Sequence, residues 1–234
     1  MSLLFILFFI IVSTGISILA AYISLRLIGR TLDWQYIYFG MAIFFIGITL
    51  HSLIALPVVV SEHGFRTLLG MLNKSELRFK LWELFYFAAA AGVGQELAKT
   101  LPILLELRRT DGKNPTPPYF YLGLNIGLGF SLSEIIFIGI TSWQPHIIEI
   151  AFYTIFVGCF ERLGATLFHM TTGGLIAFGF EKRKVKYFLL ISIVLHALLD
   201  AFVGFTYKFP IVSDAVEEGI LFSFSLLLSV KNSI

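Results

Sequence analysis

Six ionisable side chains lie deep inside otherwise apolar stretches of this sequence. They are Glu96, Lys99, Glu134, His169, His196 and Asp200. Ionisable groups at mid-membrane depth are costly and usually face a polar interior in which they have a function. A carboxylate close to imidazoles suits the activation of water for hydrolysis, with the carboxylate as general base. A lone histidine in such a stretch more often forms an interhelical hydrogen bond than takes part in catalysis. The spacing of these residues therefore has to show whether they form one site.

Helical spacing places two pairs of these residues on shared faces. Glu96 and Lys99 are three positions apart, so the ammonium can hold the carboxylate ionised. His196 and Asp200 are four positions apart, so the aspartate can fix the imidazole tautomer or join it as a ligand. The spacing therefore favours one polar site built from several helices.

The same residue types also fit a zinc site. His169, His196 and a carboxylate such as Glu134 would be the ligands, with water in the fourth position. The sequence contains no HExxH helix, so spacing does not select the metal. Zinc-assisted and metal-free glutamate chemistry both stay open.

Composition identifies the elements that must hold these side chains. Hydrophobic residues make up 57% of the 234-residue chain and charged residues only 14%, against about 25% charged residues in soluble domains. The net charge of +2 and the lack of a basic cluster exclude a nucleic-acid binder. We expect an all-α polytopic membrane protein, forming a single domain over residues 1–234.

Apolar runs of about 20 residues predict seven membrane-spanning helices. The expected spans are Leu3–Leu25, Trp34–Val60, Leu84–Leu105, Tyr119–Ser142, Ile147–Phe180, Tyr187–Tyr207 and Ile211–Val230. The first is read as a retained helix, and the second as kinked near Pro57. The fifth is read as one long tilted helix, the alternative being two short spans hinged at Gly158 or Gly164.

The distribution of lysine and arginine predicts the orientation. Ten of these residues fall on one side of the seven spans and five on the other, which puts the N-terminus outside and the C-terminus in the cytoplasm. Counted from the cytoplasmic helix ends, the acidic and imidazole groups lie at similar depths of about 14–22 Å. We therefore expect a single polar site between the third and sixth helices. His51 is read as a packing residue, and Glu161 with Arg162 as a structural pair with other helices.

Four short motifs occur in order on consecutive helices. They are Gln95-Glu96-x-x-Lys99, Phe130-x-x-x-Glu134, Glu161-Arg162 followed by His169, and His196-x-x-x-Asp200. Over about residues 84–207 the chain resembles the PrsW and YhfC membrane proteases, relatives of the type II CAAX prenyl endopeptidases and the bacteriocin-processing group. The chain departs from these families at Gln95, where they usually have a first glutamate.

The resemblance implies an intramembrane endopeptidase with a cytoplasm-accessible cavity. Glu96 would activate water, Glu134, His169 and His196 would be its partners, and Asp200 would accompany the last histidine. The substrate would be a membrane protein or a lipid-modified peptide, and the location the plasma membrane of a prokaryote. A transporter with a proton relay is disfavoured because repeat halves and matching broken helices are absent from the sequence.

The chain is also similar to a non-catalytic protein, the anterior-pharynx-defective scaffold subunit of γ-secretase. That scaffold has seven helices, a Gln-Glu pair in the third and single histidines in the fifth and sixth, which Gln95, Glu96, His169 and His196 match. It lacks acids equivalent to Glu134 and Asp200, so the protease interpretation is favoured. The scaffold alternative implies a presenilin-like aspartyl protease as partner.

Overall fold

The computed structural model describes residues 3–63, 80–110, 118–141 and 152–208, and within these ranges every regular element is a helix. The elements are α1 (Leu3–Leu27), α2 (Trp34–Val58), a π-helical segment (Val59–His63), α4 (Leu81–Arg109), α5 (Tyr119–Thr141), α6 (Phe152–Glu181) and α7 (Val185–Lys208). The all-helical expectation is confirmed. The seventh predicted span, at 211–230, lies outside the described residues.

Five of the described helices are long and apolar enough to cross a membrane. They are the segments Ile6–Leu27, Trp34–Glu62, Tyr119–Thr141, Val157–Glu181 and Val185–Phe205. The predicted third span corresponds to α4, which is long enough but more polar, because Gln95, Glu96 and Lys99 interrupt its apolar run. From Phe152 onward, the predicted fifth span is one continuous helix, α6, rather than two short helices hinged at a glycine.

Local sequence signals set several helix ends. Asp33 caps the start of α2, where its side chain accepts a hydrogen bond from the backbone N–H of Gln35. Pro57 lies in the last turn of α2, which continues as the π-helical segment. Between α6 and α7, Arg183 adopts a positive φ of 57° and the N–H of Lys184 bonds to the carbonyl of Gly179 at 2.7 Å. This tight turn makes α6 and α7 antiparallel neighbours.

Glycines bring the backbones of α5 and α6 into direct contact. A Cβ atom on Gly127 would lie 2.0 Å from the carbonyl oxygen of His169, and one on Gly123 would lie 2.1 Å from that of Gly173. The other side of α5 approaches α2 in the same way, since a Cβ on Gly129 would lie 1.9 Å from the carbonyl oxygen of Ile37. Close glycine packing of this kind is typical of membrane helices. It holds His169 firmly against α5.

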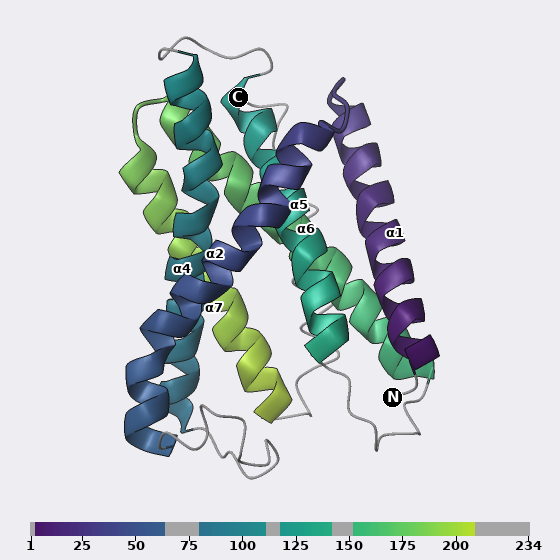
Figure 1. The fold of residues 1–234 in the computed structure, drawn as a ribbon, viewed down its shortest axis with the longest axis vertical. Coiled ribbons are helices and arrows are strands. Elements are labelled where there is room, and N and C mark those ends of the chain that lie inside the picture. Colours follow the sequence, from purple (N-terminus) through teal and green to yellow (C-terminus); the bar gives the residue numbers. More distant parts are fainter. Residues whose placement is uncertain (1–2, 64–79, 111–117, 142–151, 209–234) are drawn as a thin grey trace.

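The helices alternate in direction along the bundle (Figure 1). The ends of α1, α4 and α6 therefore lie at the same end of the molecule as the starts of α2, α5 and α7. The basic residues of these segments gather there: Arg26, Arg30, Arg108, Arg109, Lys182, Arg183, Lys184 and Lys186. The arrangement agrees with the predicted up-and-down topology. Which end faces the cytoplasm stays a prediction.

Candidate functional site

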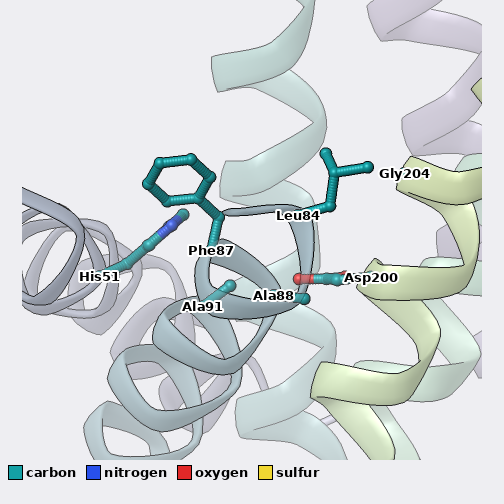
Figure 2. Close-up of a pocket in the computed structure, with 7 residues that line it drawn as sticks. All are labelled: His51, Leu84, Phe87, Ala88, Ala91, Asp200 and Gly204. Atoms are coloured by element: carbon teal, nitrogen blue, oxygen red, sulfur yellow. The ribbon is translucent and has the colours of Figure 1, made fainter. Parts of the chain in front are cut away.

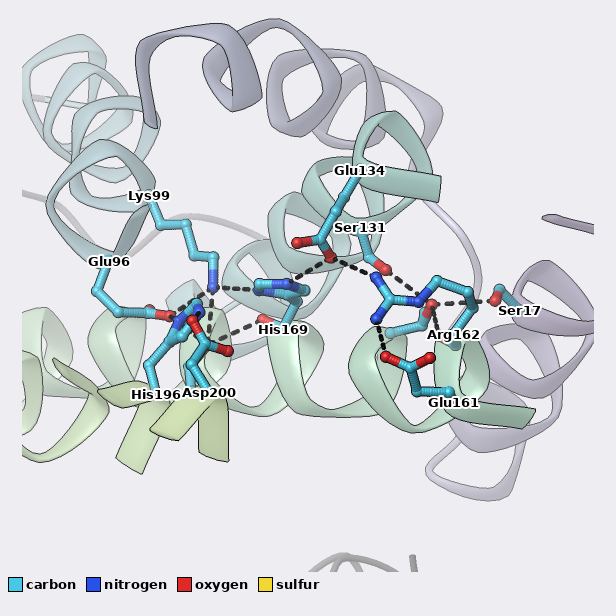
Figure 3. A network of polar contacts seen from close by, with 12 residues as sticks. Ser17, Glu96, Lys99, Ser131, Glu134, Glu161, Arg162, His169, His196 and Asp200 are labelled. Atoms are coloured by element: carbon cyan, nitrogen blue, oxygen red, sulfur yellow. Dashed lines mark hydrogen bonds and ion pairs between the residues drawn. The ribbon is translucent and has the colours of Figure 1, made fainter. Parts of the chain in front are cut away.

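Four helices deliver the six predicted side chains to one buried region (Figure 3). Glu96 and Lys99 come from α4, Glu134 from α5, His169 from α6, and His196 and Asp200 from α7. Ligand atoms of Glu96, His169 and His196 all lie within 4.8 Å of one another. The side chains that the sequence places at similar depths thus lie together in one site, as predicted.

Glu96 is at the centre of this cluster, with no exposed surface. Its Oε1 atom accepts hydrogen bonds from Lys99 Nζ at 2.7 Å and from Thr172 Oγ1 at 3.2 Å, and it lies 2.5 Å from His196 Nδ1. Its Oε2 atom is buried and has no hydrogen-bond partner among the described residues. One oxygen of the carboxylate is therefore fixed, and the other is left as a free acceptor.

Lys99 is also fully buried, and its ammonium is saturated with acceptors. Besides Glu96, Nζ lies 2.8 Å from His169 Nδ1 and 2.9 Å from Thr172 Oγ1. The ammonium also stands 5.0 Å from the centre of the Phe130 ring, in cation–π contact. An ammonium has three hydrogens to donate and no acceptor, so His169 Nδ1 must be the acceptor in this pair.

A second set of contacts extends the cluster towards α1. The other ring nitrogen of His169, Nε2, lies 3.1 Å from Glu134 Oε2, and Glu134 lies 3.4 Å from Arg162. Arg162 also donates to Glu161 at 2.6 Å. Arg162 pairs with another helix, as expected, and the Glu161–Arg162 pair is joined to the site through Glu134 (Figure 3).

Asp200 connects the buried cluster to a small cavity. Its Oδ2 atom lies 3.5 Å from His196 Nε2, and 37% of its side chain is exposed, whereas Glu96 has no exposure. The cavity holds about 200 Å³. Its walls are mostly apolar and are formed by His51, Leu84, Phe87, Ala88, Ala91, Asp200 and Gly204 (Figure 2).

The cavity lies towards one end of the bundle. On α4 its lining precedes Glu96, and on α7 its lining follows His196. It therefore lies between the site and the end of the bundle opposite the basic turn at Lys182–Lys184. Under the predicted orientation this is the non-cytoplasmic half, while the resemblance led us to expect access from the cytoplasm.

Two residues of the site were not predicted from the sequence. Thr172 contacts both members of the Glu96–Lys99 pair, which lie on another helix. His51, interpreted as a packing residue, lines the cavity with Asp200, and its buried Nδ1 atom has no partner in the described part of the chain. Gln95 is buried but is not part of the cluster. Of the Gln95–Glu96 pair, it is therefore Glu96 that contacts a histidine of the cluster, His196.

The three grouped ligand atoms are compatible with a metal ion. Two imidazole nitrogens and a carboxylate oxygen form a common donor set for zinc. The grouped carboxylate is that of Glu96, whereas the sequence suggested Glu134, whose Oε2 faces the opposite ring nitrogen of His169. The ammonium of Lys99 contacts Glu96 Oε1 and His169 Nδ1, so a metal bound through these atoms would have to take them from it.

Apolar helices with a buried glutamate–histidine cluster between them define a polytopic membrane protein with an intramembrane polar site. The sequence profile of the YhfC intramembrane metalloprotease family matches residues 140–221. This match bears out the resemblance to PrsW/YhfC-type proteases and indicates an integral membrane protein with a protease-like function. The matched residues include His169, His196 and Asp200. Glu96 lies before the matched segment. No curated protein and no solved structure matches the chain significantly.

Proposed function

We propose that this chain is an intramembrane endopeptidase in which Glu96 is the general base that activates water. One observation supports this assignment above the others. Glu96 Oε1 is held by three contacts, while the buried Oε2 has no partner among the described residues. A carboxylate fixed through one oxygen presents the other in a defined direction, which is what a general base requires.

The proposed reaction is direct attack of water on a peptide carbonyl carbon. Glu96 Oε2 takes one proton from the water as the new C–O bond forms, and the carbonyl becomes a tetrahedral oxyanion. When the C–N bond breaks, that proton passes to the leaving nitrogen, which yields a carboxylic acid and an amine. Glu96 returns to its ionised form, with the charge of Lys99 beside it throughout.

The histidines position and polarise these groups. His196 contacts Glu96 through Nδ1 and faces Asp200 through Nε2, so it lies between the base and the cavity. His169 is tied to Glu134 and orients Lys99. A metal bound by Glu96, His169 and His196 would supply Lewis-acid polarisation of the substrate carbonyl.

The apolar surroundings of the cavity support a proposal about the substrate class. Leu84, Phe87, Ala88 and Ala91 offer apolar surface beside Asp200, which faces His196. A membrane-borne peptide could place an apolar side chain there and bring its backbone carbonyl to the cluster. We therefore propose membrane proteins or lipid-modified peptides as substrates, and a prokaryotic plasma membrane as the location.

The test is whether the purified chain cleaves without a partner protein. The parent protein is reconstituted into liposomes with a transmembrane peptide that carries a fluorophore and a quencher. We expect cleavage, with fragments identified by mass spectrometry. The absence of cleavage across a panel of apolar transmembrane sequences would contradict the proposal.

A scaffold role is the second candidate, because Glu96 and Lys99 have no exposed surface and tie three helices together. A scaffold resembling the anterior-pharynx-defective subunit would co-purify with a presenilin-like aspartyl protease and would cleave nothing alone. Affinity purification from native membranes distinguishes the two roles. In the scaffold case, substitutions at Glu96, His169 or His196 would weaken partner binding.

A further inference from the structure

The ammonium of Lys99 stands where a metal ion would have to bind. Glu96, His169 and His196 bring three ligand atoms within 4.8 Å of one another. Lys99 Nζ lies 2.7 Å from the carboxylate of Glu96 and 2.8 Å from Nδ1 of His169. The cation of the cluster is therefore supplied by the chain itself.

Two cations cannot share the Nδ1 atom of His169. His169 Nδ1 has one lone pair, which accepts the hydrogen bond from Lys99 in this arrangement. The other ring nitrogen, Nε2, faces Glu134. A zinc ion bound through Nδ1 would need the same lone pair at about 2.0–2.1 Å. Binding of the metal and binding of the ammonium at His169 are thus mutually exclusive.

The structure also shows why the ammonium stays in place. Lys99 is fully buried, and Glu96, His169 and Thr172 accept its three hydrogens. The ring of Phe130 gives it a further cation–π contact. A metal that displaced it would have to compensate for the loss of all these contacts.

We propose that Lys99 is an internal cation that competes with a divalent metal for Glu96 and His169. The parent protein then keeps a metal-free cluster, and the Glu96–His169–His196 group binds a metal only after the ammonium has left it. This inference concerns metal binding alone and does not depend on peptide hydrolysis. In this proposal the cluster differs from a conventional zinc site, although both contain histidine nitrogens and a carboxylate oxygen.

The experiment compares the parent with Lys99→Met, which keeps the length of the side chain but removes its charge and its donors. Each purified protein is freed of metal and titrated with Zn²⁺ in a calorimeter and with Co²⁺ under visible spectroscopy. We expect Lys99→Met to bind one ion per chain, on the order of 10–100-fold more tightly than the parent. Its cobalt spectrum should be that of a tetrahedral site with nitrogen and oxygen ligands.

Two further variants show that the gain belongs to this cluster. Lys99→Gln, which is also uncharged, should show the same gain and serves as a substitute if Lys99→Met does not fold. Adding Glu96→Gln to either variant should abolish the gain, because one ligand is lost. A parent protein that binds one zinc as tightly as the variants would overturn the proposal, as would a gain that persists without Glu96. Neither result depends on whether the protein cleaves peptides.

Discussion

The tautomer of His169 follows from its two neighbours. Because Lys99 donates to Nδ1, the ring hydrogen belongs on Nε2, where it points to Glu134 Oε2 at 3.1 Å. Glu134 in turn faces Arg162 at 3.4 Å. Glu134 is thus a positioning residue that holds His169, and through it Lys99, in the orientation the cluster needs.

Replacing Glu134 tests this role with two matched variants. Glu134→Leu leaves Nε2–H of His169 without an acceptor, so we expect a lower unfolding temperature and activity reduced on the order of 10–100-fold. Glu134→Gln keeps an acceptor oxygen and should restore much of the stability. Thermal unfolding in detergent and cleavage rates measure the two effects. Equal losses in both variants would contradict the positioning role.

The six chemical residues could be predicted because each interrupts an apolar run, which a sequence displays directly. Thr172 and His51 could not, for a different reason. Threonine is common in membrane helices as a packing residue, and His51 has no charged neighbour on its own helix. Both residues are identified by side chains on other helices. Thr172 contacts Lys99, and His51 lines the cavity together with Asp200. Such pairings become visible only when the helices are placed.

The contact between α5 and α6 positions His169, and Gly127 makes it possible. A Cβ atom at this position would meet the carbonyl oxygen of His169 at 2.0 Å, a distance that backbone atoms cannot relieve without moving α6. We expect Gly127→Ala to destabilise the protein by about 1–3 kcal/mol or more and to impair cleavage. The readout is the unfolding temperature together with the cleavage rate.

Gly15 in α1 supplies the control for this substitution. A Cβ atom there would have nothing within 4 Å, and the residue is helical. Gly15→Ala should leave activity unchanged and leave stability equal or slightly higher, since alanine favours helix more than glycine does. A loss as large as that of Gly127→Ala would show that the effect is not specific to the α5–α6 contact.

The helices themselves were largely predictable, because length and hydropathy define a membrane span. The single long α6 also agrees with prediction, since neither Gly158 nor Gly164 interrupts it. The face that each helix presents to its neighbours was less predictable. Backbone contacts such as Gly123 with Gly173 depend on which helices become neighbours, and no periodic pattern in the sequence specifies that.

Across the whole molecule, the basic helix ends and the cavity lie at opposite ends of the bundle. With the basic end in the cytoplasm, the cavity belongs to the outer half of the membrane. A cysteine placed at Gly204 tests this arrangement, because a Cβ there would be 3.7 Å from Leu84, an ordinary contact. The natural Cys159 is buried, so the parent protein provides the background.

We expect Gly204→Cys to be labelled by a membrane-impermeant maleimide added to intact cells. The parent should stay unlabelled under the same conditions. A reporter inserted within residues 112–116, between α4 and α5, should be active in the cytoplasm. Labelling of Gly204→Cys only after the cells are opened would reverse the predicted orientation and place the cavity on the cytoplasmic side.

The most direct test of the proposed chemistry is the cleavage rate of Glu96→Gln beside that of the parent, in the same liposomes and with the same peptide. Removing a general base typically lowers the rate by about 10²–10⁴-fold, and we predict a loss in this range. The double variant with Lys99→Met removes both charges of the pair, leaves no unpaired buried ammonium, and should be equally inactive. A folded Glu96→Gln protein that cleaves as fast as the parent would contradict the assignment of Glu96 as the base.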